Sequence, residues 1–289
     1  MTDLFAEAGF FQEALGFTKQ QYGFPERLIE KDYLCSLLLE YLSDAHKNLV
    51  FKGGTCLAKV HADFYRLSED LDFVIPMRTD ASRTARSRTA EGLKAIIAAL
   101  PNRFPSVKVI EPLMGANSST QYNALLGYRS LLGQREETIK IEVGLREPLL
   151  HPVVNGDAKT ILLDPVSGGT LVPSKQVRCI SRAEAFAEKF RAAFTRREVA
   201  IRDFFDIDYA VQTLGLEPQA TELVGLVQAK LAVPGNEPIN VSAERLATLR
   251  QQLAPQLRPV LREKDFRAFD LDRAFGVVAE MAGRLSVRP

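Results

Sequence analysis

Apolar residues along the chain follow helical spacing at both ends and strand-like alternation in the middle. Residues 4–46 are predicted to be helical because apolar side chains recur there every three or four positions. The clearest stripe comprises Leu28, Tyr33, Leu37, Leu38 and Tyr41. Helical spacing returns after Ser181, which is expected to begin a helix in a capping box with Glu184. We therefore expect two helical regions that flank a core of another kind.

The middle of the chain combines strand patterns with one helix. Residues 81–100 carry apolar side chains at helical spacing. Short apolar or alternating runs predict strands at 48–51, 71–75, 106–112, 121–131, 136–146 and 176–180. Residues 148–173 are rich in proline and glycine and predict an irregular connection. We expect an α+β protein with a mixed sheet, divided into an N-terminal helical region (1–47), a core (48–180) and a C-terminal helical region (181–289).

A pair of glycines follows the first predicted strand. Residues 52–59 read Lys-Gly-Gly-Thr-Cys-Leu-Ala-Lys, so the strand ends at Gly53 and Gly54 and a helix begins at Thr55. Glycine lets the backbone approach a phosphate closely. The amides that begin the helix favour an anion, and the Thr55 hydroxyl is a further donor. The sequence thus predicts a phosphate cradle, and Lys59 is expected either to reach the phosphates or to be solvated.

Two carboxylates lie at the beginning of the next predicted strand, one directly before it and one within it. Asp70 and Asp72 alternate with apolar residues, so both carboxylates are expected on one face of the sheet. Adjacent carboxylates repel each other unless a cation neutralises them, and oxygen-only ligands suit Mg²⁺ or Mn²⁺. Glu142 lies between Ile141 and Val143 in a later strand and is expected to converge on the same metals. Such a two-metal site activates an attacking hydroxyl and binds nucleotide phosphates.

One lysine of the C-terminal region needs an anionic partner. Lys189 lies at the edge of an apolar helix face, where an unpaired ammonium group is costly. Its partner is either a nucleotide triphosphate or Asp203 and Asp206, which lie three residues apart on the next predicted helix. Arg197 carries the same ambiguity. Spacing favours the ion pair without excluding the phosphate contact.

Taken in order, these motifs resemble those of a known superfamily. A glycine turn with its helix, a strand Asp-x-Asp and a later strand acid are similar to the nucleotidyltransferase superfamily that includes polymerase beta. More narrowly, residues 52–59 together with residues 66–73, Arg-Leu-Ser-Glu-Asp-Leu-Asp-Phe, resemble the AbiEii/AbiGii toxin family, which includes the MenT toxins. The ordered combination is far more specific than any single motif.

The resemblance extends beyond this core, to about residues 25–210. Residues 29–33, Ile-Glu-Lys-Asp-Tyr, resemble the acidic-basic-acidic entry helix of the family. Its helical "E…EK…R…RDxxD" segment is matched by Glu184, Glu188, Lys189, Arg197 and residues 202–206. Some relatives have an aspartate as the third acid, where this chain has Glu142.

The resemblance implies a polymerase-beta-like nucleotidyltransferase core and transfer of a nucleoside monophosphate from a nucleoside triphosphate, with release of pyrophosphate. In several members the acceptor is the 3′ end of tRNA, within a toxin–antitoxin or abortive-infection system. The implied catalytic residues are Asp70, Asp72, Glu142 and Lys189. The three acids are also the implied metal ligands, and Lys189 is expected to neutralise the charge that develops on the triphosphate. The implied nucleotide-binding residues are Gly53, Gly54, Thr55, Lys59, Ser68, Lys189, Arg197, Asp203 and Asp206. Implied partners are the nucleotide, tRNA and a cognate antitoxin protein.

Composition narrows the setting. The net charge of +1 excludes a wholly basic nucleic-acid-binding surface, so any RNA contact must come from local clusters such as the four arginines between residues 78 and 88. The few cysteines and histidines are dispersed, and their spacing predicts no zinc site. They are Cys35, Cys56, Cys179, His46, His61 and His151. Three cysteines suit a reducing compartment, and no apolar run approaches membrane-spanning length. We expect a cytoplasmic protein that does not associate with membranes.

Several alternatives stay open. The same chemistry could modify a protein or small-molecule hydroxyl instead of RNA. A metal-dependent nuclease also needs clustered carboxylates, but it leaves the glycine turn unexplained. The chain could also be a catalytically silent binding module that acts through a partner. Ser68 is interpreted as a turn or cap residue, or as a phosphorylation site whose charge would repel metal and nucleotide.

Overall fold

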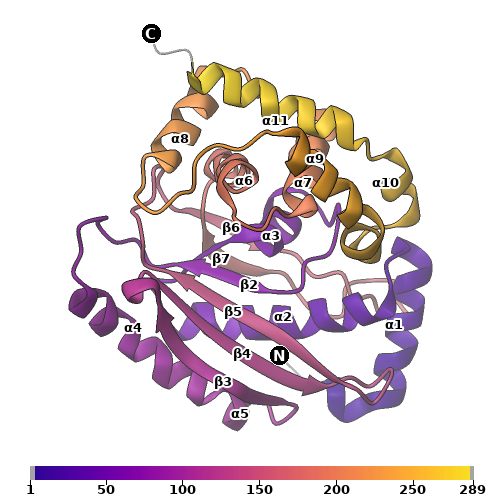
Figure 1. Ribbon diagram of the computed structural model, residues 1–289. Helices are drawn as coiled ribbons and strands as arrows, with labels where there is room; N and C mark the ends of the chain where they lie inside the picture. The colour runs from indigo at the N-terminus through magenta and orange to yellow at the C-terminus, as the bar shows by residue number, and fades with distance from the viewer. Residues whose placement is uncertain (1–3, 287–289) are drawn as a thin grey trace. The chain divides into compact units, whose positions relative to one another are not determined.

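The computed structural model describes residues 4–286 and contains a mixed seven-stranded sheet (Figure 1). The strand order is β3-β4-β5-β2-β1-β7-β6. The strands are β1 (Val50–Lys52), β2 (Leu71–Val74), β3 (Val107–Ala116), β4 (Gln121–Arg129), β5 (Glu136–Gly144), β6 (Val154–Ala158) and β7 (Lys175–Cys179). Two neighbouring pairs are parallel, β2 with β5 and β1 with β7, and the others are antiparallel. The expected α+β class with a mixed sheet is confirmed.

The chain divides into two compact units. The first contains residues 1–149 and 153–180, and the second contains residues 150–152 and 181–289. Helices of the first unit are η1 (Leu4–Glu7), α1 (Ala8–Tyr22), α2 (Glu26–Ala45), α3 (Gly53–Cys56), the π-helical turn η2 (Leu57–His61), α4 (Arg83–Ala98), α5 (Leu100–Arg103) and η3 (Asn117–Ser119). The N-terminal helices thus share a unit with the sheet.

Helices are the only regular secondary structure in the described part of the second unit. Its helices are α6 (Arg182–Thr195), α7 (Ile201–Thr213), α8 (Thr221–Leu231), α9 (Ala243–Gln252), η4 (Leu253–Leu257), η5 (Arg258–Val260), α10 (Glu263–Ala268) and α11 (Leu271–Ser286). Helix α6 contacts α7, α8 and α11, so it lies at the centre of this unit. Its buried face includes Phe186, Phe190 and Ala193, as the helical spacing predicts. None of the helices between residues 4 and 286 has both the length and the apolar character needed to span a membrane.

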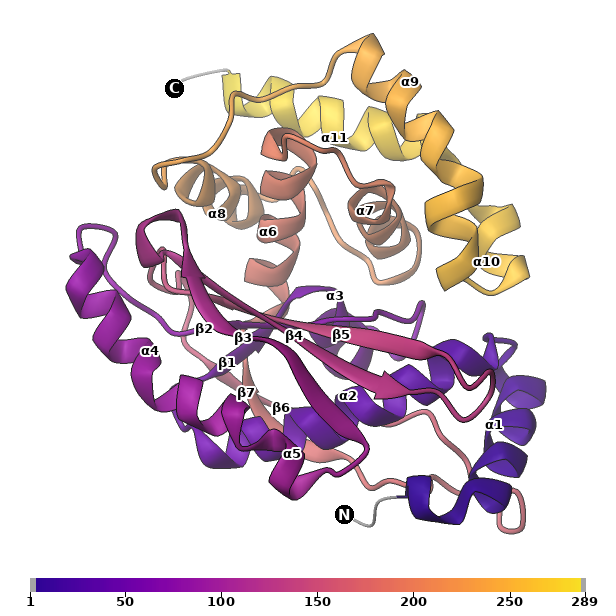
Figure 2. The same ribbon diagram turned by 60° about the horizontal axis from the view of Figure 1, so that its bottom comes forward.

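Most predicted elements of the first unit are confirmed, with α2 as the clearest case. Four residues of its predicted stripe are buried, namely Leu28, Tyr33, Leu37 and Leu38, while Tyr41 is half-buried. The helix is buried nearly all round between residues 28 and 39, charged residues included. Helix α2 contacts the sheet at β7, and helix α4 contacts the sheet at β3 (Figure 2). A helix that is buried on every side must find partners for its charged side chains inside the protein.

One strand was missed by the sequence pattern. Residues 154–158 lie in the stretch expected to be irregular, yet they form β6, which pairs antiparallel with β7. The segment Val-Asn-Gly-Asp-Ala has little intrinsic strand preference. It is an edge strand, so the hydrogen bonds it makes with β7 determine its conformation.

Candidate active site

Strand register brings two of the three predicted carboxylates side by side. Parallel strands β2 and β5 pair Asp72 with Glu142, one position beyond the pair Leu71 and Ile141. Neighbouring strands lie about 4.8 Å apart, so these two side chains leave the same face of the sheet at adjacent positions. Leu71 and Ile141 are buried on the opposite face, whereas Asp72 and Glu142 are half-buried.

The third carboxylate, Asp70, is attached to the same pair of strands. Its Oδ1 accepts a hydrogen bond of 3.2 Å from the backbone nitrogen of Lys140. Asp70 is half-buried. The structure therefore brings Asp70, Asp72 and Glu142 together at the β2–β5 pair.

Lys140 is a member of this cluster that the sequence analysis missed. Its Nζ lies 2.8 Å from Glu142 Oε2. Burial lowers the pKa of Lys140, but the hydrogen bond and charge of Glu142, followed by the charges of Asp72 and Asp70, outweigh burial and raise it. A signal was available, because Lys140 precedes Glu142 by two residues in an alternating strand and must share its face. The ammonium group is the cation that offsets the carboxylate charges here.

The glycine turn packs directly against Asp72. Gly53 has φ +75°, in the region that favours glycine, and a Cβ added there would lie 2.7 Å from Asp72 Cγ. That distance is shorter than real Cβ contacts, so only glycine fits. Lys52 is paired with Asp72 across the antiparallel strands β1 and β2. The turn therefore lies within van der Waals distance of the carboxylate cluster.

The second glycine lies against a buried arginine. A Cβ on Gly54 would come within 2.7 Å of an Arg66 guanidinium nitrogen and 3.0 Å of Ser68 Oγ. Arg66 is only 2 % exposed. The structure thus places Ser68 at the glycine turn, as expected for a residue near the cradle, and adds Arg66 as a cation beside it.

The Thr55 hydroxyl is used inside the protein. Thr55 is buried, and its Oγ1 donates a hydrogen bond to the backbone carbonyl of Asp70. This bond fastens the start of the helix after the glycines to the segment that carries the first carboxylate. Thr55 therefore positions the turn, and its hydroxyl is not aimed at solvent.

Three consecutive charged residues of α2 hold the surroundings of the cluster in place. Glu30 accepts hydrogen bonds from Ser130 Oγ at 2.5 Å and from the Leu131 nitrogen at 2.8 Å. Lys31 lies 3.2 Å from Glu69, the neighbour of Asp70. Burial raises the pKa of Glu69, but Lys31 and then Arg27 outweigh it, so the net pKa is lowered. The entry helix thus orients the site through ion pairs and hydrogen bonds.

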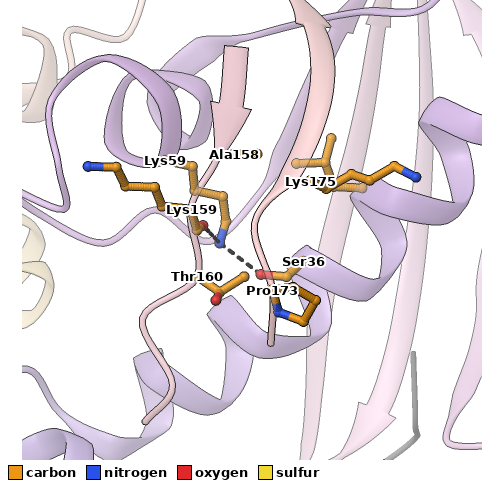
Figure 3. A pocket seen from close by; sticks show the side chains of 8 residues that line it. Ser36, Lys59, Ala158, Lys159, Thr160, Pro173 and Lys175 are labelled. Atoms are coloured by element: carbon orange, nitrogen blue, oxygen red, sulfur yellow. Dashed lines mark hydrogen bonds between the residues drawn. The ribbon is translucent and has the colours of Figure 1, made fainter. Parts of the chain in front are cut away.

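Lys59 faces the protein interior, which overturns the expectation that it reaches phosphates or solvent. It is 0 % exposed, and its Nζ lies 2.7 Å from Asp32 Oδ1 and 2.9 Å from Ser36 Oγ, both on α2. Figure 3 shows the ammonium group between Ser36 and the backbone carbonyl of Lys159. The physical reason is that Asp32 and Ser36 on the neighbouring α2 supply the anion and the hydrogen-bond acceptor that a buried ammonium group needs.

The remaining predicted residues belong to the second unit. Lys189 Nζ lies 2.8 Å from Asp203 and 2.7 Å from Asp206, the ion pairs that spacing favoured. Burial raises the pKa of Asp203, but Lys189 and then Arg196 outweigh it and lower the net value. Arg197 is exposed and pairs with Glu237 at 2.7 Å. Lys189, Asp203 and Asp206 therefore form one buried charge cluster, and Arg197 lies outside it.

Half of the predicted capping box is present at the start of α6. Ser181 Oγ accepts a hydrogen bond from the Glu184 nitrogen, as predicted. The Glu184 carboxylate instead accepts hydrogen bonds from the Leu150 and His151 nitrogens at 3.0 Å and pairs with Lys230 at 2.7 Å. This acid is fully buried and fixes the segment 150–152 to the helices of its own unit.

The donor set at the β2–β5 pair fits a divalent cation. Asp70, Asp72 and Glu142 offer hard carboxylate oxygens, the ligands that Mg²⁺ and Mn²⁺ prefer. They are half-buried, so solvent and ligand can reach them. Their mutual repulsion is compensated by Lys140, which shows that the protein concentrates negative charge here. Chemically, this arrangement can bind metal-bound phosphates beside a glycine turn.

Comparison with known proteins gives one family and a set of structures. The sequence profile described as "Nucleotidyl transferase AbiEii toxin, Type IV TA system" matches residues 36–277. None of the curated proteins matches the chain in sequence.

Solved structures resemble the whole chain at low sequence identity. A crystal structure of a nucleotidyltransferase from Helicobacter pylori, described there as putative, has 16 % identity and a TM-score of 0.53, covering 91 % of this chain and 96 % of its own. JHP933 from Helicobacter pylori has 16 % identity and a TM-score of 0.50, with 91 % and 93 % covered. The nucleotidyltransferase toxin MenT4 of Mycobacterium tuberculosis has 17 % identity and a TM-score of 0.52, with 89 % and 92 % covered. These similarities establish a shared fold.

Proposed function

Because the chain belongs to the AbiEii nucleotidyltransferase toxin family of type IV toxin–antitoxin systems, we propose that it transfers a nucleoside monophosphate from a nucleoside triphosphate to the 3′ end of tRNA. The observation that carries this proposal is the pairing of Asp72 with Glu142 beside a glycine turn that leaves no room for a side chain. Neither a nuclease nor a silent binding module accounts for both features. A protein or small-molecule hydroxyl is the alternative acceptor.

Asp70, Asp72 and Glu142 would hold Mg²⁺ or Mn²⁺ in this reaction. A bound divalent cation lowers the pKa of the acceptor hydroxyl and stabilises the charge that develops on the transferred phosphoryl group. Asp72 lies in β2, Asp70 lies directly before it, and Glu142 lies in the neighbouring strand β5. The sheet therefore fixes the positions of the ligands. Lys140 would hold the Glu142 carboxylate in its position through their ion pair.

The glycine turn would bind the triphosphate. Gly53 brings the backbone close to Asp72, Gly54 brings it close to Arg66 and Ser68, and neither carries a Cβ that would keep a phosphate away from the turn. Arg66 and Ser68 lie against the same turn and would contribute charge and a hydroxyl donor. Lys59 pairs with Asp32 and therefore does not contact the phosphates. It would instead stabilise the segment after the glycine turn by joining it to α2.

The family resemblance also predicts nucleotide contacts in the second unit, and these stay a prediction. The residues are Lys189, Arg197, Asp203 and Asp206. The ion pairs of Lys189 support a structural role in the second unit. The exposed Arg197 is the member of this set that could reach a ligand without breaking a buried pair.

Exposed arginines of the first unit support an RNA acceptor. Arg83 and Arg88 are exposed on α4, shortly after the strand that carries Asp72, and Arg78 is exposed in the preceding loop. Arg86, by contrast, is buried and donates to the Leu145 carbonyl, so it stabilises the fold. The family also implies an antitoxin protein as partner. We place the reaction in the cytoplasm, where tRNA, nucleotides and reduced cysteines are found together.

Transfer of label from nucleotides tests the proposal. Purified protein is incubated with total tRNA, Mg²⁺ and each of the four α-labelled nucleoside triphosphates. We expect label to enter tRNA with at least one nucleotide and to be lost with a chelator. The variants Asp70→Ala and Asp72→Ala should lose at least about 10²-fold of the rate, because one metal-binding carboxylate is removed.

Asp157→Ala is the matched control, since Asp157 is an exposed aspartate on β6 of the same sheet. It should keep the full rate. Melting temperatures separate lost chemistry from lost folding, because removing one of several like charges at the site should not lower stability. An unchanged rate for Asp72→Ala would refute the site. Label entering protein or a small molecule, but not RNA, would replace the acceptor and keep the chemistry.

A further inference from the structure

Two cysteines and a histidine lie close together in the first unit. Their sulfur and nitrogen atoms differ in ligand type from the oxygen atoms of the carboxylate cluster. The ligand atoms of Cys56, His61 and Cys179 all lie within 4.8 Å of one another. Both cysteines are 0 % exposed, and His61 is half-buried. Both cysteines are free thiols. The third cysteine, Cys35, lies on α2 and is not part of the group.

The π-helical turn accounts for the first two members. Cys56 and His61 are five residues apart, which in an α-helix would place them about 140° apart around the axis. A π-helix forms hydrogen bonds between residues five apart, so its wider turn leaves residues at this spacing nearer to the same side of the axis than an α-helix does. The turn spans Leu57–His61, directly after Cys56. A π-helical turn is rare and often marks a functional site.

Strand pairing supplies the third member. Cys179 ends β7, which runs parallel to β1, and Phe51 is its partner in the register. Helix α3 and the π-helical turn follow β1 at once, so the last residue of β7 comes close to them. This sulfur arrives from more than 100 residues further along the chain.

We propose that Cys56, His61 and Cys179 bind a zinc ion. Two thiolates and an imidazole are the soft and borderline ligands that Zn²⁺ favours, unlike the all-oxygen set at Asp70 and Asp72. Thiolates of a tetrahedral zinc site lie about 3.8 Å apart, so the observed spacing needs little contraction. A water molecule or another small ligand would complete the tetrahedron.

The surroundings of the cluster suit metal binding. His61 Nε2 lies 3.0 Å from the Ile180 carbonyl. A carbonyl only accepts, so Nε2 carries the hydrogen and Nδ1 keeps the lone pair that a metal requires. Such a bond from the second nitrogen to a backbone carbonyl is usual for histidine ligands.

The space at Cys179 agrees with this interpretation. A Cβ on Gly156 would come within 3.1 Å of Cys179 Sγ and overlap Val60, so a glycine on β6 leaves room at the sulfur. The backbone of β6 therefore passes close to this sulfur without a side chain that would cover it.

The zinc site goes beyond the transfer of nucleotides. Cys56 follows Thr55, so a metal held here would tie the helix after the glycine turn to β7. It would stiffen the support of the cradle without contributing a ligand to it. Zinc binding does not depend on whether the carboxylate site is active.

Cobalt spectroscopy tests the proposal on the full-length protein. The protein is stripped with a chelator under reductant and titrated with Co²⁺ and then with Zn²⁺. We expect one equivalent of Co²⁺ to give thiolate charge-transfer bands and the strong visible bands of tetrahedral coordination, and Zn²⁺ to abolish both. Cys56→Ser and Cys179→Ser should lose about half of the thiolate band and bind at least about 10-fold more weakly. His61→Gln should keep the thiolate band and bind more weakly.

Two controls keep the test specific. Cys35→Ser removes the buried cysteine outside the group, and Asp72→Ala disables the carboxylate site, so both should keep the full thiolate band. X-ray absorption at the zinc edge of the wild-type protein needs no variant, and we expect about two sulfur atoms at about 2.3 Å and nitrogen at about 2.0–2.1 Å.

A zinc shell of oxygen and nitrogen alone would overturn the proposal. So would an absence of thiolate bands in the reduced protein, or variants that bind as the wild type does. A disulfide between Cys56 and Cys179 in reduced, metal-treated protein would also overturn it. An inactive transfer assay would leave the metal result unchanged, so the two proposals fail separately.

Discussion

Gly53 shows how a single residue can connect the backbone to the chemistry. Its φ of +75° is open to glycine at little cost, and the missing side chain leaves space that Asp72 fills. The carboxylate and the turn are therefore packed as one unit. Any side chain at position 53 would move one of them.

Replacing Gly53 tests this dependence. Gly53→Ala should lower the free energy of unfolding by at least about 1–2 kcal/mol, because the backbone is strained and the Cβ overlaps Asp72. It should also lower the transfer rate, since Asp72 must shift. Urea unfolding and the labelling assay measure both effects.

Gly92→Ala is the matched control, because Gly92 lies in α4 and an added Cβ meets nothing within 4 Å. That substitution should stabilise the protein by about 0.5–1 kcal/mol and leave the rate unchanged. A Gly53→Ala protein as stable and active as the wild type would contradict the packing argument.

Helices are held to the sheet by buried charges at specific positions. Helix α2 carries Asp32, which pairs with Lys59 of η2, and both side chains are almost completely buried. Burial raises the pKa of Asp32, although Lys59 lowers it in part. Breaking such a pair leaves an uncompensated charge, which costs more than the pair contributes.

Lys59→Met should therefore destabilise the protein by about 3–5 kcal/mol near neutral pH. The loss should shrink in acid. Without Lys59 the folded-state pKa of Asp32 rises further, and a raised pKa in an acid gives stability that is present at low pH and lost as pH rises through it. Unfolding in urea at several pH values measures the loss. The double variant Lys59→Met/Asp32→Leu should regain most of it, and a loss that does not vary with pH would contradict this account.

The buried aspartate of the pair between helices α6 and α7 has a lowered pKa, whereas the pKa of Asp32 is raised. Lys189 and Arg196 lower the pKa of Asp203 despite its burial. A lowered pKa gives stability that is present above the unfolded value of about 3.9 and lost as pH falls through the folded value. Asp203→Asn should thus be less stable than the wild type near neutral pH, and the two should converge below about pH 4. Melting temperatures across this range check the prediction, and parallel curves would contradict it.

The chain has two separate cores, so we expect a substitution in one core to destabilise mainly that unit. Each unit has its own buried charges, Lys59 with Asp32 in the first and Lys230 with Glu184 in the second. The Lys230 side chain is only 1 % exposed and also lies 3.2 Å from Glu188. Removing it leaves a buried carboxylate in the helical unit alone.

Hydrogen exchange can separate the two cores. Lys230→Met should speed amide exchange in α6 and α8 by about 10²-fold, the equivalent of about 3 kcal/mol, while β2 and β5 change far less. Lys59→Met should show the reverse order. Equal acceleration of both sets of amides in either variant would contradict independent cores.

Local patterns were enough for much of the fold. Alternation in β2 and β5 and helical spacing in α2 and α6 report which faces are buried, and burial is the main force that forms these elements. The pattern Asp-x-Asp likewise places two carboxylates on one side of a strand without any knowledge of the sheet. Edge strand β6 was not predicted because its residues have no such pattern. Its extended conformation depends on the hydrogen bonds with β7.

Positions that depend on the path of the backbone were decided by the tertiary structure. Folding brings Lys59 of the π-helical turn against Asp32 of α2, and the wider turn lets Cys56 and His61 lie close together. The parallel pairing of β1 with β7 brings Cys179 to the same point. Periodicity reports only neighbours along the chain, whereas these contacts join segments whose meeting requires the whole sheet to be assembled.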